Sequence, residues 1–166
     1  MGQAALLLGS NVGDRLGYLE KARFYIEKRA GKILDSSSLY ETAAWGITDQ
    51  PSFINQALLI ETEIKPDMLL PILLDIEKLL GRERMEKWGP RIIDVDILYY
   101  DDVVMNVDYL KIPHPFLQER RFSLVPLNEI SPAWIHPVLK LSVSEMLNNC
   151  KDISEVLKYS EIRNEL

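Results

Sequence analysis

A chain of 166 residues can bury most of its apolar surface in one core, so we expect a single domain over 1–166. Its only cysteine, Cys150, excludes an internal disulfide and a cysteine metal cage, and it favours a reducing compartment, the cytoplasm. The net charge of −6 argues against a general nucleic-acid binder, and no apolar stretch approaches the length that spans a membrane.

The first part of the chain alternates apolar runs with one helical pattern. It predicts a strand at Gln3–Leu8 and a helix at Asp14–Arg29, where apolar residues recur at helical spacing. The β-branched segment Lys32–Thr42 and the apolar segment Phe53–Ile64 are typical of paired strands. The segment Trp45–Ser52 contains Gly, Asp and Pro and is expected to be a loop.

The second part predicts a helix, a strand and helical additions. The helix begins at Pro66, which suits a first turn, and ends at Gly81. Ile92–Tyr100 is the next strand, and helical segments are expected at Gln118–Ile130 and after Leu141. The order β-α-β-β-α-β predicts an α+β, ferredoxin-like fold: an antiparallel sheet with helices packed on it and extra C-terminal helical elements.

Two acids alternate within the last predicted strand, in the sequence Asp94-Val95-Asp96. Alternate side chains of a strand share a face, so both carboxylates should project together while Ile93, Val95 and Ile97 enter the core. Adjacent carboxylates repel each other, and a divalent cation removes this repulsion. Magnesium usually takes one or two carboxylates together with water and phosphate oxygens. The alternative is an exposed strand edge with two solvated acids.

A local basic cluster precedes these acids and contains Arg82, Arg84, Lys87 and Arg91. Arginine presents a planar fork that matches phosphate oxygens, and a Gly-Pro turn brings Arg91 close to the carboxylates. Metal-binding carboxylates with neighbouring arginines are what phosphoryl transfer requires. Arg82 or Arg84 could instead compensate the dipole of the preceding helix.

Other polar and aromatic residues give weaker signals. Glu77 alone reads as a surface glutamate. His114 stands between two prolines that hold its backbone rigidly, although a lone histidine is more often structural, as we expect for His136. Trp45 and Trp88 occur in glycine-containing segments, where a flat heterocycle could stack against them.

Four segments together carry a resemblance to a known family: LLLGSNVGDR, SSLYETAAWGITDQPSFINQAL, LLDIEKLLGRERMEKWGPRIIDVDIL and IPHPFLQERRFSLVPLNEI. With its motifs GR-x-R, WGPR-x-x-D-x-D and PH-x(5)-R, the chain resembles 6-hydroxymethyl-7,8-dihydropterin pyrophosphokinase over most of its length to Pro132. The resemblance implies that pyrophosphate passes from MgATP to the pterin hydroxymethyl group, with release of AMP, in folate biosynthesis. It also implies a ferredoxin-like monomer with small-molecule substrates only, and neither nucleic acid nor membrane as a partner.

The resemblance further implies roles for individual residues. Asp94 and Asp96 would bind two magnesium ions that bridge the ATP phosphates, while Arg82 and Arg91 would stabilise the transferring group. Contacts with ATP would come from Glu77, Arg84, Ile97, His114 and Arg120. The pterin pocket would consist of Thr42, Ala43, Trp45, Phe53, Asn55, Trp88 and Phe122. Within it, Asn55 would read the ring edge, and Phe53 and Phe122 would enclose the ring.

Two other functions are compatible with the same pattern. Another magnesium-dependent nucleotidyl transferase on a similar scaffold would release pyrophosphate instead of AMP. A non-enzymatic ferredoxin-like module would bind a regulatory ligand or RNA without consuming ATP. RNA binding of that kind needs a basic sheet surface with an aromatic run, which the net charge of −6 and the strand sequence IIDVDILYY oppose.

Overall fold

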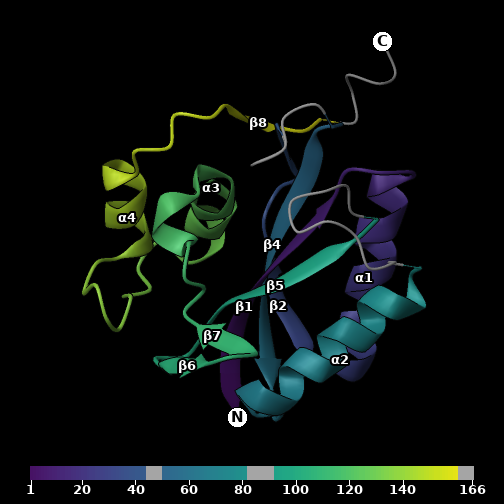
Figure 1. Ribbon diagram of the computed structural model, residues 1–166, viewed down its shortest axis with the longest axis horizontal. Coiled ribbons are helices and arrows are strands. Elements are labelled where there is room, and N and C mark those ends of the chain that lie inside the picture. The colour runs from purple at the N-terminus through teal and green to yellow at the C-terminus, as the bar shows by residue number, and fades with distance from the viewer. Residues whose placement is uncertain (44–49, 82–91, 161–166) are drawn as a thin grey trace.

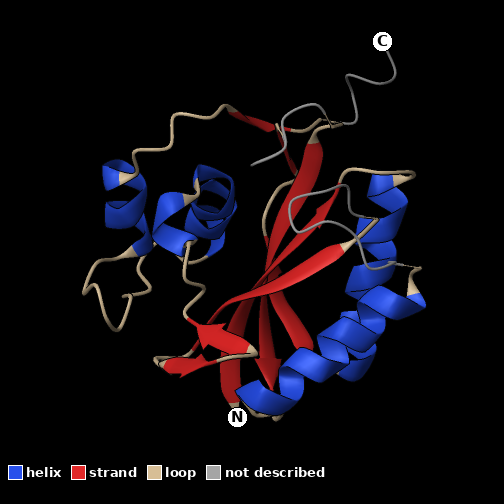
Figure 2. Ribbon diagram, in the orientation of Figure 1, coloured by secondary structure: helices blue, strands red, loops and turns tan. Residues whose placement is uncertain are grey.

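The computed structural model describes residues 1–43, 50–81 and 92–160 and shows a mixed α+β fold around a main antiparallel sheet (Figures 1 and 2). Neighbouring strands of this sheet follow the order β5 (Asp94–Tyr100), β1 (Gly2–Ser10), β4 (Phe53–Thr62), β3 (Tyr40–Thr42) and β8 (Val156–Lys158). Also paired with β4 is β2 (Lys32–Ser36). A separate hairpin consists of β6 (Met105–Val107) and β7 (Leu110–Ile112).

Helices cover both faces of the main sheet. One face carries α1 (Arg15–Arg29) and α2 (Pro66–Leu79), and the other carries α3 (Arg121–Ile130) and α4 (Val143–Asn149) (Figure 1). Within the described ranges, no helix combines the length and apolar character needed to cross a membrane.

The central strand β1 is buried on both faces because its side chains alternate between two cores. Leu6 and Leu8 pack in the core that includes residues of α1 and α2. Ala5 and Leu7 pack in a second core, with residues of α3 and α4. A strand buried on both faces reads as a continuous apolar run, which explains the sequence AALLL.

Three of the described helices, α1, α3 and α4, begin where a side chain accepts one of their first N–H groups. Asp14 caps α1 by accepting a hydrogen bond from Gly17 N at 3.1 Å. A capping box of Ser142 and Glu145 begins α4. The first residue of α3, Arg121, donates its N–H at 3.0 Å to Asp152, a carboxylate from the C-terminal segment. That segment therefore fastens the start of α3 before it continues into β8.

Three sequence predictions about the elements differ from the structure. The single strand expected over Lys32–Thr42 is divided into β2 and β3 near Ser37, where the Ser37 N–H still donates to Ala57 but side chains take over the other bonds. The Ser37 hydroxyl accepts the N–H of Ala57 at 2.9 Å, and its carbonyl accepts the Gln56 amide at 2.9 Å. The C-terminal part expected to be helical contains α4 but also β8, which pairs with the edge strand β3. The expected helix at Gln118–Ile130 begins instead as a short 3₁₀ turn followed by α3.

Candidate active site

Asp94 and Asp96 lie at the start of β5 and are both partly exposed, whereas the intervening Val95 is buried in the core beneath α1 and α2. Ile93 and Ile97 belong to the same core. The alternation predicted from the sequence is therefore confirmed, and the two carboxylates share the face opposite α1 and α2.

Glu77 of α2 is buried behind this acidic pair, with 3% of its surface exposed. Its Oε2 accepts a hydrogen bond from the N–H of Val95 at 2.7 Å. The interpretation of Glu77 as a surface residue is therefore wrong: α2 uses it to fix the backbone of β5 between the two acids. Its predicted contact with ATP stays a prediction.

Gly9 at the end of β1 stands between two groups of predicted site residues. It pairs with Asn55 of β4 on one side and with Asp94 of β5 on the other. Residues paired in this way project to the same face, so Asn55 and Asp94 lie on the same face on either side of β1. Two strand spacings separate their backbones by roughly 10 Å. A Cβ at Gly9 would approach Asn55 Oδ1 to 2.8 Å and Phe53 Cδ1 to 3.5 Å. Glycine thus leaves open the space between the two groups.

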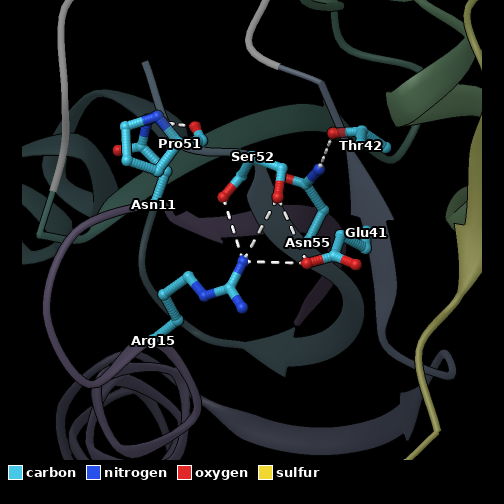
Figure 3. A network of polar contacts seen from close by, with 7 residues as sticks. All are labelled: Asn11, Arg15, Glu41, Thr42, Pro51, Ser52 and Asn55. Atoms are coloured by element: carbon cyan, nitrogen blue, oxygen red, sulfur yellow. Dashed lines mark hydrogen bonds and ion pairs between the residues drawn. The ribbon is translucent and has the colours of Figure 1, made fainter. Parts of the chain in front are cut away.

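The predicted pterin residues on β3 and β4 form a buried polar pair beside a ring. Asn55 Nδ2 donates to Thr42 Oγ1 at 2.9 Å, and both side chains are buried (Figure 3). Thr42 pairs with Phe53 across the two strands, which places Phe53 on the same face. Ala43 is exposed immediately after β3. The structure therefore brings together Thr42, Phe53 and Asn55, and their predicted contact with a pterin stays a prediction.

Arg120 connects α3 electrostatically with the two acids of β5. Its side chain is 6% exposed, and its guanidinium lies 4.8 Å from the ring centre of Phe116 and 5.4 Å from that of Phe122. Burial lowers the pKa of Arg120, and the charges of Asp96 and Asp94 act in the opposite direction. A buried guanidinium near two carboxylates has the chemistry that can bind phosphate oxygens, and the predicted contact of Arg120 with ATP stays a prediction.

His114 follows β7 and is held to β5 by its backbone, because its N–H donates to the carbonyl of Leu98 at 2.9 Å. Burial, with a smaller contribution from Arg120, lowers the pKa of His114 to about 4. Its Nδ1 accepts the N–H of Phe116 at 3.2 Å. The neutral ring therefore carries its proton on Nε2, which is available as a donor. His136 has a different role, since its Nδ1 accepts the N–H groups of Val138 and Leu139 in a turn.

A pocket of about 240 Å³ opens at the free edge of β5. Leu70 of α2, Val95, Asp96, Ile97, His114 and Pro115 line it together with 108–111 of the β6–β7 hairpin. Three of these side chains, those of Asp96, Ile97 and His114, were predicted to bind metal or ATP. The hairpin residues were missed. Alternating apolar residues around the dipeptide Asp108-Tyr109 are the signal that could have found them.

Five predicted site residues lie outside the described residues: Trp45, Arg82, Arg84, Trp88 and Arg91. Their predicted roles stay predictions.

The chemistry of the acidic pair fits a divalent metal that arrives with a nucleotide. Among the residues that the structure describes, no group of three or more His, Cys, Asp or Glu side chains could hold a metal ion alone. Two carboxylates suffice for magnesium when water and phosphate oxygens complete its ligands. Paired carboxylates, a buried arginine near them and a pocket at the adjacent sheet edge define the class of metal-dependent phosphoryl-transfer enzymes.

The particular family follows from comparison with known proteins. Residues 5–132 match the 7,8-dihydro-6-hydroxymethylpterin-pyrophosphokinase (HPPK) family, and the chain belongs to that family. It is 42% identical over 160 residues to the 2-amino-4-hydroxy-6-hydroxymethyldihydropteridine pyrophosphokinase of Aquifex aeolicus, covering 95% of this chain and 99% of that protein. It is 44% identical over 133 residues to the Methylorubrum extorquens protein of the same name, covering 80% of this chain and 84% of that protein.

Longer relatives contain a region similar to this chain. The folic acid synthesis protein FOL1 of Dictyostelium discoideum is 38% identical over 144 residues, which are 87% of this chain and 22% of that protein. A crystal structure of Plasmodium falciparum HPPK-DHPS superposes with a TM-score of 0.77 at 21% identity and covers 89% of this chain and 45% of that chain. This likeness shows the fold, and the chain spans less than half of both longer proteins. The resemblance inferred from the sequence is confirmed: the chain is an ATP-dependent pyrophosphokinase of folate biosynthesis.

Proposed function

We propose that the chain transfers the β- and γ-phosphates of ATP, as one pyrophosphoryl group, to the hydroxymethyl oxygen of 6-hydroxymethyl-7,8-dihydropterin. The observation that carries this proposal is the position of Gly9 between Asn55 and Asp94. Strand pairing places the proposed pterin residues of β3 and β4 beside the proposed metal ligands of β5, on the same face of the sheet. A bound pterin and a bound triphosphate would therefore meet over Gly9.

The pterin end is supported by the residues of β3, β4 and α3. Pterin is a flat heterocycle with hydrogen-bonding groups along one edge, and it needs rigid polar partners beside apolar ones. Asn55 is held by Thr42 and keeps its Oδ1 directed toward Gly9. Phe53 and Phe122 are both partly exposed and could lie against the ring. Trp45, Trp88 and Ala43 complete the pocket that the family resemblance implies.

The nucleotide end is supported by the pocket at the edge of β5. Ile97 and Leu70 give it an apolar wall, and the Nε2–H of neutral His114 provides a donor. From this pocket the phosphates would extend along β5 toward Asp96 and Arg120. Glu77 and Arg84 are the remaining proposed ATP contacts.

Asp94 and Asp96 would hold two magnesium ions, which when bound with ATP would neutralise the charge that develops on the phosphate oxygens. The pterin hydroxyl oxygen would form a bond with the β-phosphorus, and the bond from that phosphorus to the α–β bridging oxygen would break. AMP would leave with that oxygen. Arg82, Arg91 and Arg120 would stabilise the transferred group, and no side chain is assigned as the base that accepts the hydroxyl proton.

The strand order supports a more specific description of the fold. We propose a ferredoxin-like βαββαβ sheet, which is supported by the position of β1 between β5 and β4, with β3 on the other side of β4. We further propose that 1–166 forms one pyrophosphokinase domain, that it is a monomer, and that it functions in the cytoplasm. Size-exclusion chromatography with light scattering tests the monomer, for which a mass of 19.1 kDa is expected.

The decisive experiment is incubation with MgATP and 6-hydroxymethyl-7,8-dihydropterin, followed by separation of the nucleotide products. One AMP per molecule of pterin consumed is expected. Release of inorganic pyrophosphate would indicate a nucleotidyl transferase instead. Pterin binding without loss of ATP would indicate a regulatory module, and either result would overturn the proposal.

A further inference from the structure

Arg15, the first residue of α1, joins the ends of two strands through a single nitrogen atom (Figure 3). Its Nη1 lies 3.0 Å from Glu41 Oε2, 3.1 Å from the carbonyl oxygen of Ser52 and 3.4 Å from Ser52 Oγ. Ser52 Oγ also donates to Glu41 Oε2 at 3.1 Å. The three residues form a closed network between α1, the end of β3 and the start of β4.

Both partners of Arg15 are direct neighbours of predicted pterin residues. Glu41 precedes Thr42, and Ser52 precedes Phe53. Thr42 and Phe53 pair across β3 and β4, and Thr42 also holds Asn55. The network therefore fixes the backbone on both sides of the chain segment between these strands.

Arg15 lies on the opposite face of the sheet from these pterin residues. Glu41 pairs with Ile54, which belongs to the core beneath α1 and α2. Alternation within a strand directs Glu41 toward that core face and Thr42 toward the site face. Arg15 can thus influence a bound pterin only through the strand ends that it holds.

The network is shielded enough to hold a fixed geometry. The side chains of Arg15 and Glu41 are 27% and 32% exposed. Asn11, which is buried, adds a second attachment, since its Nδ2 donates to Gln50 Oε1 and to the carbonyl of Pro51, each at 2.9 Å. The residues immediately before β4 are therefore bound to the β1–α1 connection at successive positions.

We propose that Arg15 is a positioning residue for the pterin site: it sets the spacing between the end of β3 and the start of β4, and so aligns Thr42, Phe53 and Asn55 with the pterin ring. This inference rests on the proposed pterin function and adds a residue to it. It requires that loss of Arg15 weakens pterin binding while ATP binding, which depends on β5, α2 and the β6–β7 hairpin, is retained.

The test compares steady-state kinetics of Arg15→Ala, Arg15→Lys and Arg29→Ala with those of the unaltered chain. For Arg15→Ala the KM for the pterin is expected to rise about fivefold, with the KM for ATP unchanged and kcat within about twofold. Arg15→Lys should restore most of the pterin affinity, because one ammonium nitrogen has three donors for the three acceptors that Nη1 contacts. Arg29→Ala is the matched control, since Arg29 is exposed at the far end of the same helix.

The same variants separate this inference from the proposed function. Direct titration of the pterin, followed by fluorescence, gives its Kd without requiring turnover. If the unaltered chain binds pterin but forms no AMP, the proposed reaction fails, and a raised Kd in Arg15→Ala still supports positioning. An unchanged pterin KM and Kd in Arg15→Ala overturns the inference. So does an equal rise in the KM for both substrates, or a fall in kcat alone, because either result indicates a general loss of structure. A chain that binds no pterin overturns both.

Discussion

The carboxylate of Glu77 accepts the backbone N–H of Val95, the residue that separates Asp94 from Asp96. A buried side chain of α2 thereby sets the position of the strand from which both candidate metal ligands project. A 2.7 Å bond to a charged acceptor is among the stronger hydrogen bonds in a protein. Changes at Glu77 should therefore affect both the stability of the fold and the geometry of the acidic pair.

Glu77→Ala is expected to lower the free energy of unfolding by about 3 kcal/mol, because the Val95 N–H loses its acceptor and a cavity forms. Glu77→Gln keeps an acceptor oxygen of the same reach and should lose only about 1 kcal/mol. Urea denaturation measures both values. Asp75→Ala is the control, since Asp75 is exposed on the same helix and should change stability by less than about 0.5 kcal/mol. Equal stability of Glu77→Ala and the control would contradict this account.

Gly9→Ala should weaken binding of the pterin and leave binding of ATP intact. The added methyl group would lie 2.8 Å from Asn55 Oδ1, closer than real Cβ contacts allow, so the Asn55 amide must leave the position in which it donates to Thr42. We expect the KM for the pterin to rise roughly tenfold, a change of about 1.4 kcal/mol. Initial rates at varied pterin and saturating ATP measure it.

The control for this substitution is Gly17→Ala, where the nearest atoms to the added Cβ belong to the carboxylate of Asp14 at the start of α1. It should reduce stability slightly through the helix cap and leave both KM values unchanged. A similar pterin KM in Gly9→Ala and the unaltered chain would show that pterin binding does not depend on the present position of the Asn55 amide.

Asp94→Ala and Asp96→Ala should each reduce AMP formation by about a thousandfold or more. Each removes a ligand of the magnesium ions that neutralise the charge on the phosphates. Pterin affinity should stay close to its original value, since Asn55 and Thr42 lie on other strands. Product assays and pterin fluorescence titration measure the two properties separately. Asp102→Ala, in the exposed turn after β5, is the matched control. Normal turnover in either β5 variant would contradict the assignment of Asp94 and Asp96 as metal ligands.

The sequence predicted those parts of the fold and site that depend on local periodicity. The alternation in 93–97 correctly assigned Asp94 and Asp96 to one face, because residue spacing alone determines which face of a strand a side chain occupies. The helices α1 and α2 were found from apolar spacing together with their Gly and Pro boundaries. Arg120 and Phe122 were assigned through the family resemblance.

Features that depend on partners distant in the sequence were missed. The strands β6, β7 and β8 have three residues each, so β6 and β7 are marked only by the short alternation on either side of Asp108-Tyr109, and β8 forms by pairing with the edge of β3. Glu77 was interpreted as a surface residue because its partner, the N–H of Val95, lies on a strand that is distant in the sequence. Arg15 ends the segment LLLGSNVGDR but was given no role, because its partners Glu41 and Ser52 come from strand ends that meet it only in the folded chain.

Lowering the pH should destabilise the protein through His114. The folded-state pKa of about 4 lies below the ordinary value of 6.5, so between these values the unfolded chain binds a proton that the folded chain does not. Stability therefore rises with pH across this interval and is lost as pH falls through it, by up to about 3 kcal/mol. Burial also lowers the pKa of His136, which adds a loss of the same sign.

His114→Asn separates the two histidines. Asparagine has a side-chain carbonyl that can accept the N–H of Phe116 in place of Nδ1, and it does not titrate. Urea denaturation at pH 7 and pH 5 should show a smaller loss of stability in this variant than in the unaltered chain, and the difference is the contribution of His114. An identical pH dependence in both proteins would mean that His114 is as easily protonated in the folded state as in the unfolded chain, and its neutral Nε2–H could no longer be assigned as the donor at the nucleotide pocket.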